Sequence, residues 1–455
     1  MRVNTVLQEA WMTAIETLSW IEMQRLSEDA AFARTVKQLS VDDPDALKLA
    51  RRLIVETVRR KNFIDAMIRR ALKDRSMEDF DLGLQSFLRL YAYETRFAKN
   101  SEKADYAEAA NIVKLGRSIL GWKEFQRIEP YLGFLLTINP KAVLEGTSDE
   151  KKTGLLTFHP TWFVGYCYRL FGRAEAIRLL EGNTGLSPTY VRLNTLKANE
   201  DVIVERAVRD GLRLEKVDGL RHTYRLQGAK GSLVRTGPFK EGLFEIQDKA
   251  SCLAAEVASP KAGMVVVDVC GAPGSLTTYL AQLMQNEGSI YSLDHSKLRM
   301  RLWQRETKRL GVDIGMPIIC DARQSFPFDV SADLVVLDPP CTQTGMFRKV
   351  PSAKWRVTPK AIDRMAELQW QMLVSCSENV KPQGTLVYTT SSITVEENEL
   401  IIERFLKWYP EFVLAEANPR ISLPGLRGMN RCQRLYPHVH DCEGAFVAKL
   451  LKIMV

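Results

Sequence analysis

The sequence has no long apolar run, and this absence excludes one large class of proteins. Among its 455 residues, no stretch approaches the roughly 18 consecutive apolar residues that a membrane span requires. The amino terminus also lacks the apolar segment of a secretory signal peptide. With 45% hydrophobic and 26% charged residues, the composition is that of an ordinary globular protein. We therefore expect a cytoplasmic protein with no membrane partner.

Cysteine and histidine are sparse and irregularly spaced. The eight cysteines show no disulfide framework, which is typical of a reduced intracellular compartment. One group near the carboxyl end, Cys432, His438, His440 and Cys442, matches no zinc-binding spacing. We therefore expect no metal site.

An excess of charge of one sign is absent from the first third of the chain. Residues 1–150 hold 23 basic and 23 acidic residues, so the net charge of +8 belongs entirely to residues 151–455. A basic catalytic half favours a polyanionic partner such as nucleic acid. The neutral part also has a basic cluster, for which a solvated helix face is favoured over phosphate contact. This cluster comprises Arg51, Arg52, Arg59, Arg60, Lys61, Arg69 and Arg70.

Periodicity divides the chain into three parts. Residues 1–145 are expected to be helical throughout, because apolar residues recur every three to four positions, and a linker lies within 140–153. Residues 155–260 mix helix and strand signals, and 189–195 alternate like a strand with one exposed face. From 261 to 455 strands and helices alternate regularly, which indicates a parallel sheet covered on both faces.

In the last part, polar or thiol groups lie at the end of each apolar run. The five runs are 264–269, 290–294, 317–321, 332–337 and 384–392. Ligands bind just outside the carboxyl ends of the strands in such a sheet. The sequence therefore predicts an enzyme with one site built from five loops.

The first of these loops indicates the kind of cofactor. Asp268 to Gly274 is a glycine-bearing turn that lets backbone N–H groups approach a ligand. Asp294 ends the next strand, where an acid can hydrogen-bond both ribose hydroxyls, and Asp321 is placed to accept from an adenine amino group. The turn has neither dinucleotide glycine spacing nor a Lys-Ser/Thr phosphate cradle. A nucleoside without phosphates, such as S-adenosylmethionine, therefore fits better than NAD or ATP.

Further motifs follow in a fixed order along residues 155–450. They are 192–196, 247–251, 268–274, 338–341, 354–356, 388–393, 397–399, 435–438 and 444–448. In these motifs the chain resembles the Fmu/Sun (RsmB-like) family of RNA cytosine-5 methyltransferases. Residues 1–140 resemble, more weakly, the all-helical NusB-like RNA-binding domain, mainly through 88–94.

The resemblance implies a fold, a cofactor and a partner. The fold is α/β, with a Rossmann-like S-adenosylmethionine methyltransferase domain (261–455) preceded by a small α+β RNA-binding subdomain (155–260) and an all-α NusB-like domain (1–145). The cofactor would be S-adenosyl-L-methionine, the partner ribosomal RNA, and the protein a monomer. The residues implied to hold the cofactor are Asp268, Cys270, Gly271, Ala272, Pro273, Gly274, Ser275, Leu276, Asp294, Lys297, Arg299, Asp321 and Asp338. Those implied to contact RNA are Arg192, Asn194, Lys354, Trp355 and Arg356.

The resemblance also implies a catalytic set, Asp338, Cys341 and Ser391, in which one residue departs from the family pattern. Methylation of carbon 5 of cytosine needs a nucleophile on carbon 6, and a thiolate is suited to this step. The family carries that thiol in a Thr-Cys-Ser motif, at the position where this chain has Ser391. In the family, the acid-Pro-Cys motif supplies the acid that binds the base and a second thiol that assists product release. Three explanations stay open: Cys341 attacks carbon 6 itself, the chain is an RNA-binding or ribosome-assembly protein that retains the fold, or the serine is an introduced substitution that arrests the reaction.

Overall fold

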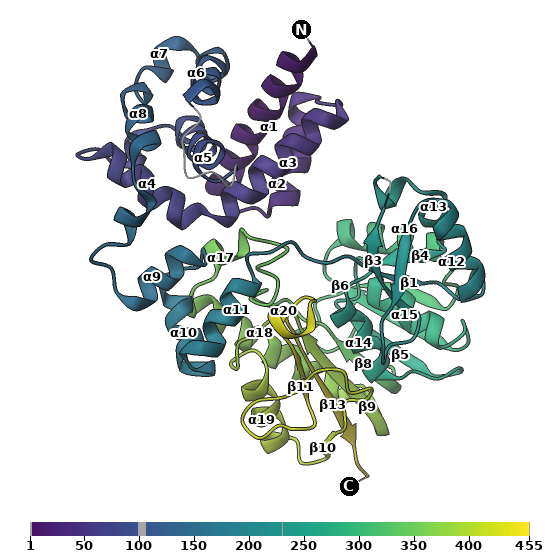
Figure 1. The fold of residues 1–455 in the computed structure, drawn as a ribbon. Helices are drawn as coiled ribbons and strands as arrows, with labels where there is room; N and C mark the ends of the chain where they lie inside the picture. The colour runs from purple at the N-terminus through teal and green to yellow at the C-terminus, as the bar shows by residue number, and fades with distance from the viewer. Residues whose placement is uncertain (1, 99–105, 230, 455) are drawn as a thin grey trace. The chain divides into compact units, whose positions relative to one another are not determined.

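The chain forms two compact units in the computed structural model, which describes residues 2–98, 106–229 and 231–454 (Figure 1). The first unit comprises Met1–Gly185 together with Val350–Arg356, and the second comprises Leu186–Lys349 together with Val357–Val455. Within those described ranges, no helix combines the length and the apolar composition needed to cross a lipid bilayer.

The first unit is built from helices. They are α1 (Arg2–Gln24), α2 (Glu28–Leu39), α3 (Pro44–Arg59), α4 (Lys61–Leu72), α5 (Leu82–Arg96), α6 (Tyr106–Leu120), α7 (Trp122–Phe125), α8 (Glu129–Thr137), α9 (Asp149–Leu156), α10 (Thr161–Phe171), α11 (Arg173–Gly182) and α17 (Ala353–Arg356). Apolar stripes at helical spacing build one core, in which α4 buries Ile64 and Ile68 and α5 buries Phe87, Leu88 and Tyr91. The prediction of a helical amino-terminal region is confirmed.

Seven residues from far along the chain complete this unit. We call this segment, Val350–Arg356, the strap. Ser352 donates its backbone N–H and its hydroxyl to the two carboxylate oxygens of buried Glu28, at 2.5 and 2.7 Å. Trp355 donates its indole N–H to the carbonyl of Val58 at 2.7 Å and packs against the helical core. Hydrogen bonds and apolar contact therefore both hold the strap to the helices.

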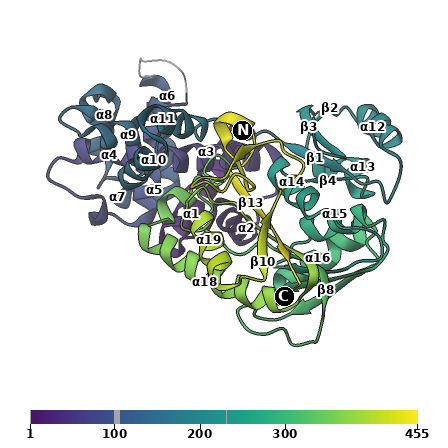
Figure 2. The same cartoon turned by 90° about the horizontal axis from the view of Figure 1, so that it is seen from below.

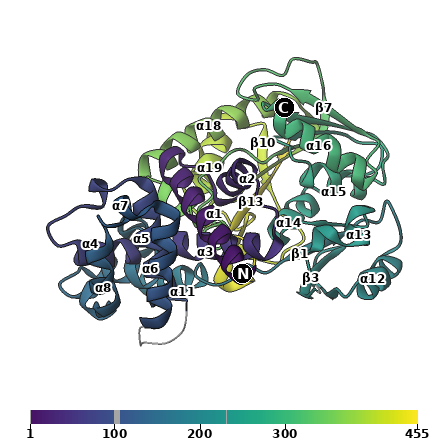
Figure 3. The same cartoon turned by 90° about the horizontal axis from the view of Figure 1, so that it is seen from above.

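The second unit begins with a four-stranded antiparallel sheet. Its elements are β1 (Tyr190–Leu193), α12 (Glu200–Arg209), β2 (Arg213–Lys216), β3 (Thr223–Gly228), α13 (Gly237–Lys240) and β4 (Phe244–Ile246). The strand order is β2-β3-β1-β4, and Figures 2 and 3 both show α12 and α13 beside β1 and β3. The prediction of an exposed face for 189–195 is wrong, because all four residues of β1 are buried. The helix α15 (Ser275–Leu283) covers its polar face, where Arg192 bonds to Thr278 of that helix at 2.9 Å.

The rest of the second unit is a larger sheet with helices. The elements are α14 (Lys249–Ala258), β5 (Val265–Val269), β6 (Ser289–Asp294), α16 (Lys297–Leu310), β7 (Gly315–Ile319), β8 (Ala332–Leu337), α18 (Pro359–Glu378), β9 (Val380–Thr390), α19 (Glu399–Trp408), β10 (Phe412–Ala415), β11 (Leu423–Pro424), β12 (Gln433–Leu435), α20 (Pro437–His440) and β13 (Ala445–Lys452), besides α15. The order is β11-β12-β13-β9-β8-β5-β6-β7, with β5 to β9 parallel and β13 antiparallel to β9.

Alternate residues of the central strands enter two different cores. On β5, Val266 packs into one apolar cluster and Val267 into another, so the sheet is covered on both faces. The predicted α/β fold with a Rossmann-like sheet is confirmed. Two strand ends differ from the prediction: β7 ends at Ile319, two residues before Asp321, and β9 covers 380–390 instead of 384–392.

Candidate active site

The turn between β5 and α15 requires glycine at two positions. A Cβ added to Gly271 would lie 2.6 Å from Oδ2 of Asp268, closer than packed atoms approach. Gly274 has a φ of +115°, a left-handed conformation that glycine adopts without strain. The glycines therefore let the chain turn tightly around the carboxylate of Asp268, the second-last residue of β5.

Asp268 is fully buried. Thr277 donates its hydroxyl to Oδ2 at 2.5 Å, and Trp303 donates its indole N–H to the same hydroxyl at 2.8 Å. Oδ1 of Asp268 has no hydrogen-bond partner among the described residues. Burial raises the pKa of Asp268 to about 7, and the nearby carboxylates of Asp338 and Asp294 also raise it. A buried oxygen without a donor fits a ligand that brings amino or hydroxyl groups.

A first cavity, of about 230 Å³, opens at the end of β6. Asp294 lies in its wall, where Oδ1 accepts from the Ser296 N–H at 2.9 Å and Oδ2 lies 3.4 Å from Nη1 of Arg299. Asp321 lies in the same wall, and hydrogen bonds from Arg323 lower its pKa to about 2. The other lining residues are Cys270, Leu293, His295, Cys320, Ala322, Arg323, Pro340, Leu368 and Met372. Two carboxylates beside an apolar wall suit a nucleoside.

A second cavity shares Cys270 with the first. Asp338, which follows β8, and Ser391, which follows β9, both line it. Burial raises the pKa of Asp338 to about 6, against the opposing effect of Arg299. The other lining residues are Ala250, Ser251, Ala254, Gly271, Ala272, Pro273, Ser275, Leu276, Thr389, Thr390, Glu443 and Ala445. Two carboxyl groups, of Asp338 and Glu443, and several hydroxyls thus line a space next to the first cavity.

Cys341 and Ser391 lie on adjoining loops. Backbone groups of Gln343 and Ser391 contact the Cys341 thiol, and the Gly345 N–H donates to the Ser391 carbonyl at 3.0 Å. Burial raises the pKa of Cys341, and the charge of Glu397 raises it further. Ser391 lines the second cavity, while Cys341 is half-buried and does not. In the described part of the chain, the Ser391 hydroxyl has no hydrogen bond to a base that would activate it.

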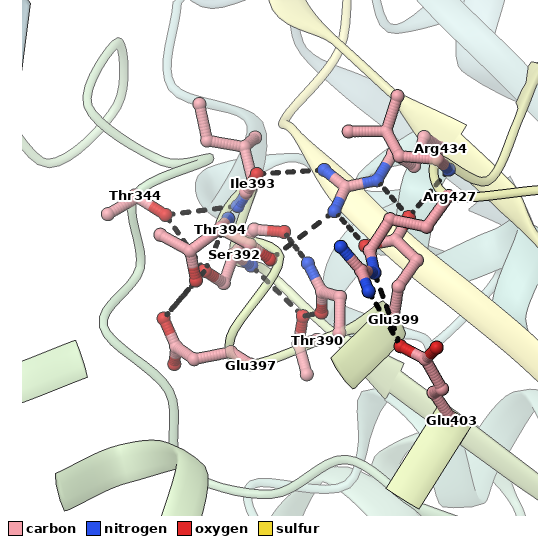
Figure 4. A network of polar contacts seen from close by, with 12 residues as sticks. Thr344, Thr390, Ser392, Ile393, Thr394, Glu397, Glu399, Glu403, Arg427 and Arg434 are labelled. Atoms are coloured by element: carbon pink, nitrogen blue, oxygen red, sulfur yellow. Dashed lines mark hydrogen bonds and ion pairs between the residues drawn. The ribbon is translucent and has the colours of Figure 1, made fainter. Parts of the chain in front are cut away.

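Glu397 is the fully buried hydrogen-bond acceptor between these loops (Figure 4). Its Oε2 accepts from the Thr342 N–H at 2.8 Å and from the Gln369 side-chain amide at 2.9 Å. Its Oε1 accepts from the hydroxyls of Ser392 and Thr394, at 2.7 and 2.9 Å. One carboxylate thus receives donors from α18 and from the loops after β8 and β9.

Two of these donors are the chain neighbours of the candidate catalytic residues. Thr342 follows Cys341, and Ser392 follows Ser391. The hydroxyl groups of Thr344 and Ser392 also lie within hydrogen-bond distance, at 2.9 Å (Figure 4). The network therefore holds the thiol and the serine in a fixed relation.

The next two residues of this motif hold the loop after β9 from its other side. Asn398 accepts from the Thr390 hydroxyl at 2.6 Å. Glu399 forms a fully buried ion pair with Arg434, whose Nη1 donates to the Ile393 carbonyl at 2.8 Å (Figure 4). Side chains of 397, 398 and 399 thus all serve to shape the loop that carries Ser391.

Two of the residues expected to contact RNA lie inside the second unit. Arg192 is fully buried and donates to Gln247 at 2.7 Å and to Thr278 at 2.9 Å. Asn194 is buried and donates to two backbone carbonyls, each at 2.8 Å. Both expectations of RNA contact are therefore corrected, because these side chains join elements of the fold.

The other three expected RNA contacts belong to the strap. Lys354 is fully buried, donates to the Phe158 carbonyl at 3.2 Å, and has a pKa that burial lowers well below its usual value. Trp355 and Arg356 donate to backbone carbonyls of the first unit, at 2.7 and 3.4 Å. The expectation that these three residues bind RNA does not fit these intramolecular contacts.

Four further residues near the site differ in how well the sequence predicted their positions. Arg299 donates to the Ala272 carbonyl and so borders the glycine turn, whereas Lys297 is exposed and lines neither cavity. The sequence indicates Glu397 only as part of a motif, because two of its donors, Thr342 and Gln369, are far away in the sequence. Glu443, in the wall of the second cavity, lies in a loop with no sequence signal.

Comparison with known proteins gives two family matches and a full-length relative. The family model described as 16S rRNA methyltransferase RsmB/F matches residues 255–451, and the NusB family model matches residues 8–118. A Bacillus subtilis protein named probable ribosomal RNA small subunit methyltransferase B is 28% identical over 450 residues, covering 96% of this chain and 98% of its own.

Two solved structures from Pyrococcus horikoshii are also similar. A methyltransferase homolog protein is 30% identical, with a TM-score of 0.61, and the match covers 68% of this chain and 100% of that chain. NSun6, solved with the S-adenosylmethionine analogue SFG, is 25% identical with a TM-score of 0.60, over 65% of this chain and 99% of that chain.

Proposed function

Because the chain belongs to the RsmB/F family of ribosomal RNA methyltransferases, we propose that it methylates carbon 5 of a cytosine in ribosomal RNA. One observation carries the proposal: the ends of β6 and β8 bring Asp294 and Asp338 into the walls of two cavities that share Cys270, which directly follows β5 and lies two residues after buried Asp268. A nucleoside cavity beside a second cavity with a carboxyl group supports transfer from a nucleoside cofactor to a base.

S-adenosylmethionine, when bound, supplies a methyl group activated by its sulfonium. Asp294 and Asp321 would hold its ribose and its adenine, because both carboxylates line the first cavity. Asp268 would accept from a donor group through Oδ1, and Cys270 to Pro273, which line the second cavity, would border the ligand where the two cavities meet at Cys270. These residues fit the cofactor by the chemistry of their donors and acceptors.

Asp338 is the group suited to hold the cytosine edge. With a pKa of about 6, its carboxyl can accept from the exocyclic amine when charged and donate to a ring nitrogen when protonated. The target base would be turned out of its stack to reach it.

Cys341 is the thiol that we propose as the nucleophile. Its proton passes to water, its sulfur bonds to carbon 6, and the electron pair of the carbon 5–carbon 6 double bond makes carbon 5 electron-rich enough to take the methyl group, which would leave the cofactor as S-adenosylhomocysteine. Carbon 5 then loses its proton to a base or water, the sulfur–carbon 6 bond breaks, and the thiolate returns. The Cys341 thiol contacts the backbone of Ser391, which lines the second cavity. This contact places the thiol next to the cavity and supports the role.

A second candidate function is RNA binding without methylation. Burial raises the pKa of Cys341, and a thiol that holds its proton is a poor nucleophile. Ser391 has a hydroxyl in the cavity wall, which ionises even less readily. These two observations favour a protein that retains the fold and binds RNA.

Transfer of tritiated methyl groups to protein-free ribosomal RNA separates the two functions. We expect incorporation by the unaltered chain, none by Cys341→Ala, and retention of most activity by Ser391→Ala. Ribosomal RNA containing 5-fluorocytosine, which cannot lose its carbon-5 substituent, should become covalently attached to Cys341. Methylation gained only in Ser391→Cys would refute Cys341 as the nucleophile, and inactivity of all versions with RNA affinity intact would favour the second function.

A further inference from the structure

The helix α16 concentrates positive charge. It carries six basic residues and one acidic residue, and therefore supplies five of the eight net charges of the chain. We propose that the exposed face of α16 binds the phosphate backbone of the RNA substrate. This inference rests on the proposed function in taking RNA as the partner.

Four of these cations form a continuous stripe. Lys297, Arg301, Arg305 and Lys308 are all exposed. With about 100° of rotation and about 1.5 Å of rise per residue, they fall within roughly 80° of the helix circumference and along roughly 16 Å of its axis. A stripe of this length spans several phosphates of a nucleic-acid strand.

The stripe is not neutralised by neighbouring carboxylates. None of its four cations forms an ion pair with another residue of the described ranges. The one acid of α16, Glu306, lies 2.6 Å from Arg309, which is outside the stripe. The positive charge of the stripe is therefore available to an external anion.

The basic cluster of α3 and α4 differs in this respect. Arg51 pairs with Asp29 at 2.5 Å, and Arg60 pairs with Glu56. Lys61 likewise lies 2.6 Å from Glu22. Internal carboxylates already compensate these three cations, which supports the interpretation of this part of the cluster as a solvated helix face.

The surroundings of the stripe suit a nucleic acid. Leu298 and Leu302 are 69% and 43% exposed on the same helix, and apolar side chains next to cations can contact sugars and bases. The helix begins two residues after His295, which lines the nucleoside cavity with Asp294. The stripe therefore starts at the cavity that we assign to the cofactor and leads away from it.

The test compares two double variants of the full chain. Arg301→Ala/Arg305→Ala removes two cations of the stripe at a spacing of four residues. Lys360→Ala/Arg364→Ala removes two exposed cations of α18 at the same spacing. In α18 an acidic residue, Asp363, lies between the two cations, and another, Glu367, lies three residues after the second. The two variants have the same net charge, so a general charge effect would change both equally.

Filter binding of labelled, protein-free ribosomal RNA is measured between roughly 50 and 200 mM KCl. We expect the α16 variant to bind roughly fivefold to tenfold more weakly, with a salt slope smaller by about 1.5, because each phosphate contact contributes roughly 0.7–0.9. The α18 variant should stay within about twofold of the unaltered chain. An equal loss in both variants, or no loss in the α16 variant, overturns the proposal.

Calorimetric titration with S-adenosylmethionine tests the proposed methyltransferase function independently of RNA binding by α16. We expect both double variants to bind the cofactor like the unaltered chain, which also reports an intact fold. Failure of cofactor binding in every version would contradict the methyltransferase mechanism and leave the RNA comparison to decide the role of α16.

Discussion

Glu397 is a buried carboxylate whose described hydrogen-bond donors are hydroxyl and amide groups. Its contacts come from Thr342, Gln369, Ser392 and Thr394. A buried acceptor with several donors contributes most when all donors remain satisfied, because each one left unpaired carries a desolvation cost. The relative position of the loops that carry Cys341 and Ser391 therefore depends in large part on the Glu397 side chain.

Glu397→Gln turns one acceptor oxygen into an amide N–H₂ that faces donors. We expect it to lower the free energy of unfolding by roughly 2–3 kcal/mol. Chemical unfolding measures this loss. The matched control is Glu403→Gln, which removes an exposed ion pair of 3.1 Å with Arg427 and should change stability by less than about 0.5 kcal/mol.

The same substitution has a chemical readout. Because the Glu397 charge raises the pKa of Cys341, its removal should shift the pH profile of Cys341 alkylation to lower pH. Equal stability of the two glutamine variants together with an unmoved profile would contradict the role assigned to Glu397.

Asp268 predicts a pH dependence of stability. Its folded-state pKa of about 7 lies above the value of about 3.9 of an unfolded aspartate. Between these values the folded state binds more protons than the unfolded state, so this contribution to stability is lost as pH rises. As pH rises from 4 to 7, the free energy of unfolding should therefore fall less in Asp268→Asn than in the unaltered chain, with a difference of roughly 2–4 kcal/mol.

Urea unfolding at several pH values in this window measures the difference. Asp313→Asn, at an exposed position, serves as the control and should follow the unaltered chain. The same curve for Asp268→Asn and the unaltered chain would show that Asp268 titrates normally.

At the scale of elements, the strands of the large sheet were predictable from the sequence, whereas the packing of α15 over the polar face of β1 was not. Apolar runs that end in an acid placed Asp268, Asp294 and Asp338 at strand ends, because strand propensity and termination are local properties. Alternation in 189–195 predicted two different faces, but no local signal says that α15 covers the polar one. The burial of Arg192 is therefore a tertiary property.

Arg192→Ala tests this correction. It leaves Gln247 and Gln282 without their buried partner, so we expect a loss of roughly 2–4 kcal/mol in the free energy of unfolding. RNA affinity of the folded fraction should change by less than about twofold, as it should for Arg213→Ala at an exposed position of β2. A specific loss of RNA affinity at unchanged stability would restore the earlier interpretation of Arg192 as an RNA contact.

The candidate site shows the same division between local and tertiary information. Motif spacing predicted that Cys341, Ser391 and most of the glycine turn follow strand ends, where the structure has them, while their roles stay predictions. It did not find the role of Glu397, whose donors Thr342 and Gln369 lie 55 and 28 residues away. It also treated the strap as an RNA contact, since exposure of a basic and aromatic motif cannot be read from its sequence.

At the scale of the whole molecule, the strap makes the first unit discontinuous in sequence. Glu28 accepts two hydrogen bonds from Ser352, and Val58 accepts one from Trp355. The domain boundary within 140–153 stays a prediction, while α9 to α11 belong to the same compact unit as α1 to α8. A fragment that ends at Gly185 lacks the strap, so the Glu28 carboxylate and the Val58 carbonyl are without these donors.

A peptide of residues 348–358 should bind such a fragment of residues 1–185. We expect the peptide to raise the thermal midpoint of the fragment, because a charged hydrogen bond is worth roughly 1.5–3 kcal/mol and the indole adds apolar contact. The control peptide carries Ser352→Ala and Trp355→Ala. If both peptides raise the midpoint equally, the strap contacts contribute nothing specific to the unit.

The position of the strap in the sequence has a consequence for synthesis of the protein. Synthesis of the helices up to Gly185 is complete about 170 residues before Arg356 is added. At roughly 5–20 residues per second, that interval lasts roughly 10–30 s. During this time Glu28 and the surface around Val58 lack their partners, and a nascent chain in this state presents a site that a chaperone or another chain can occupy before its own strap arrives.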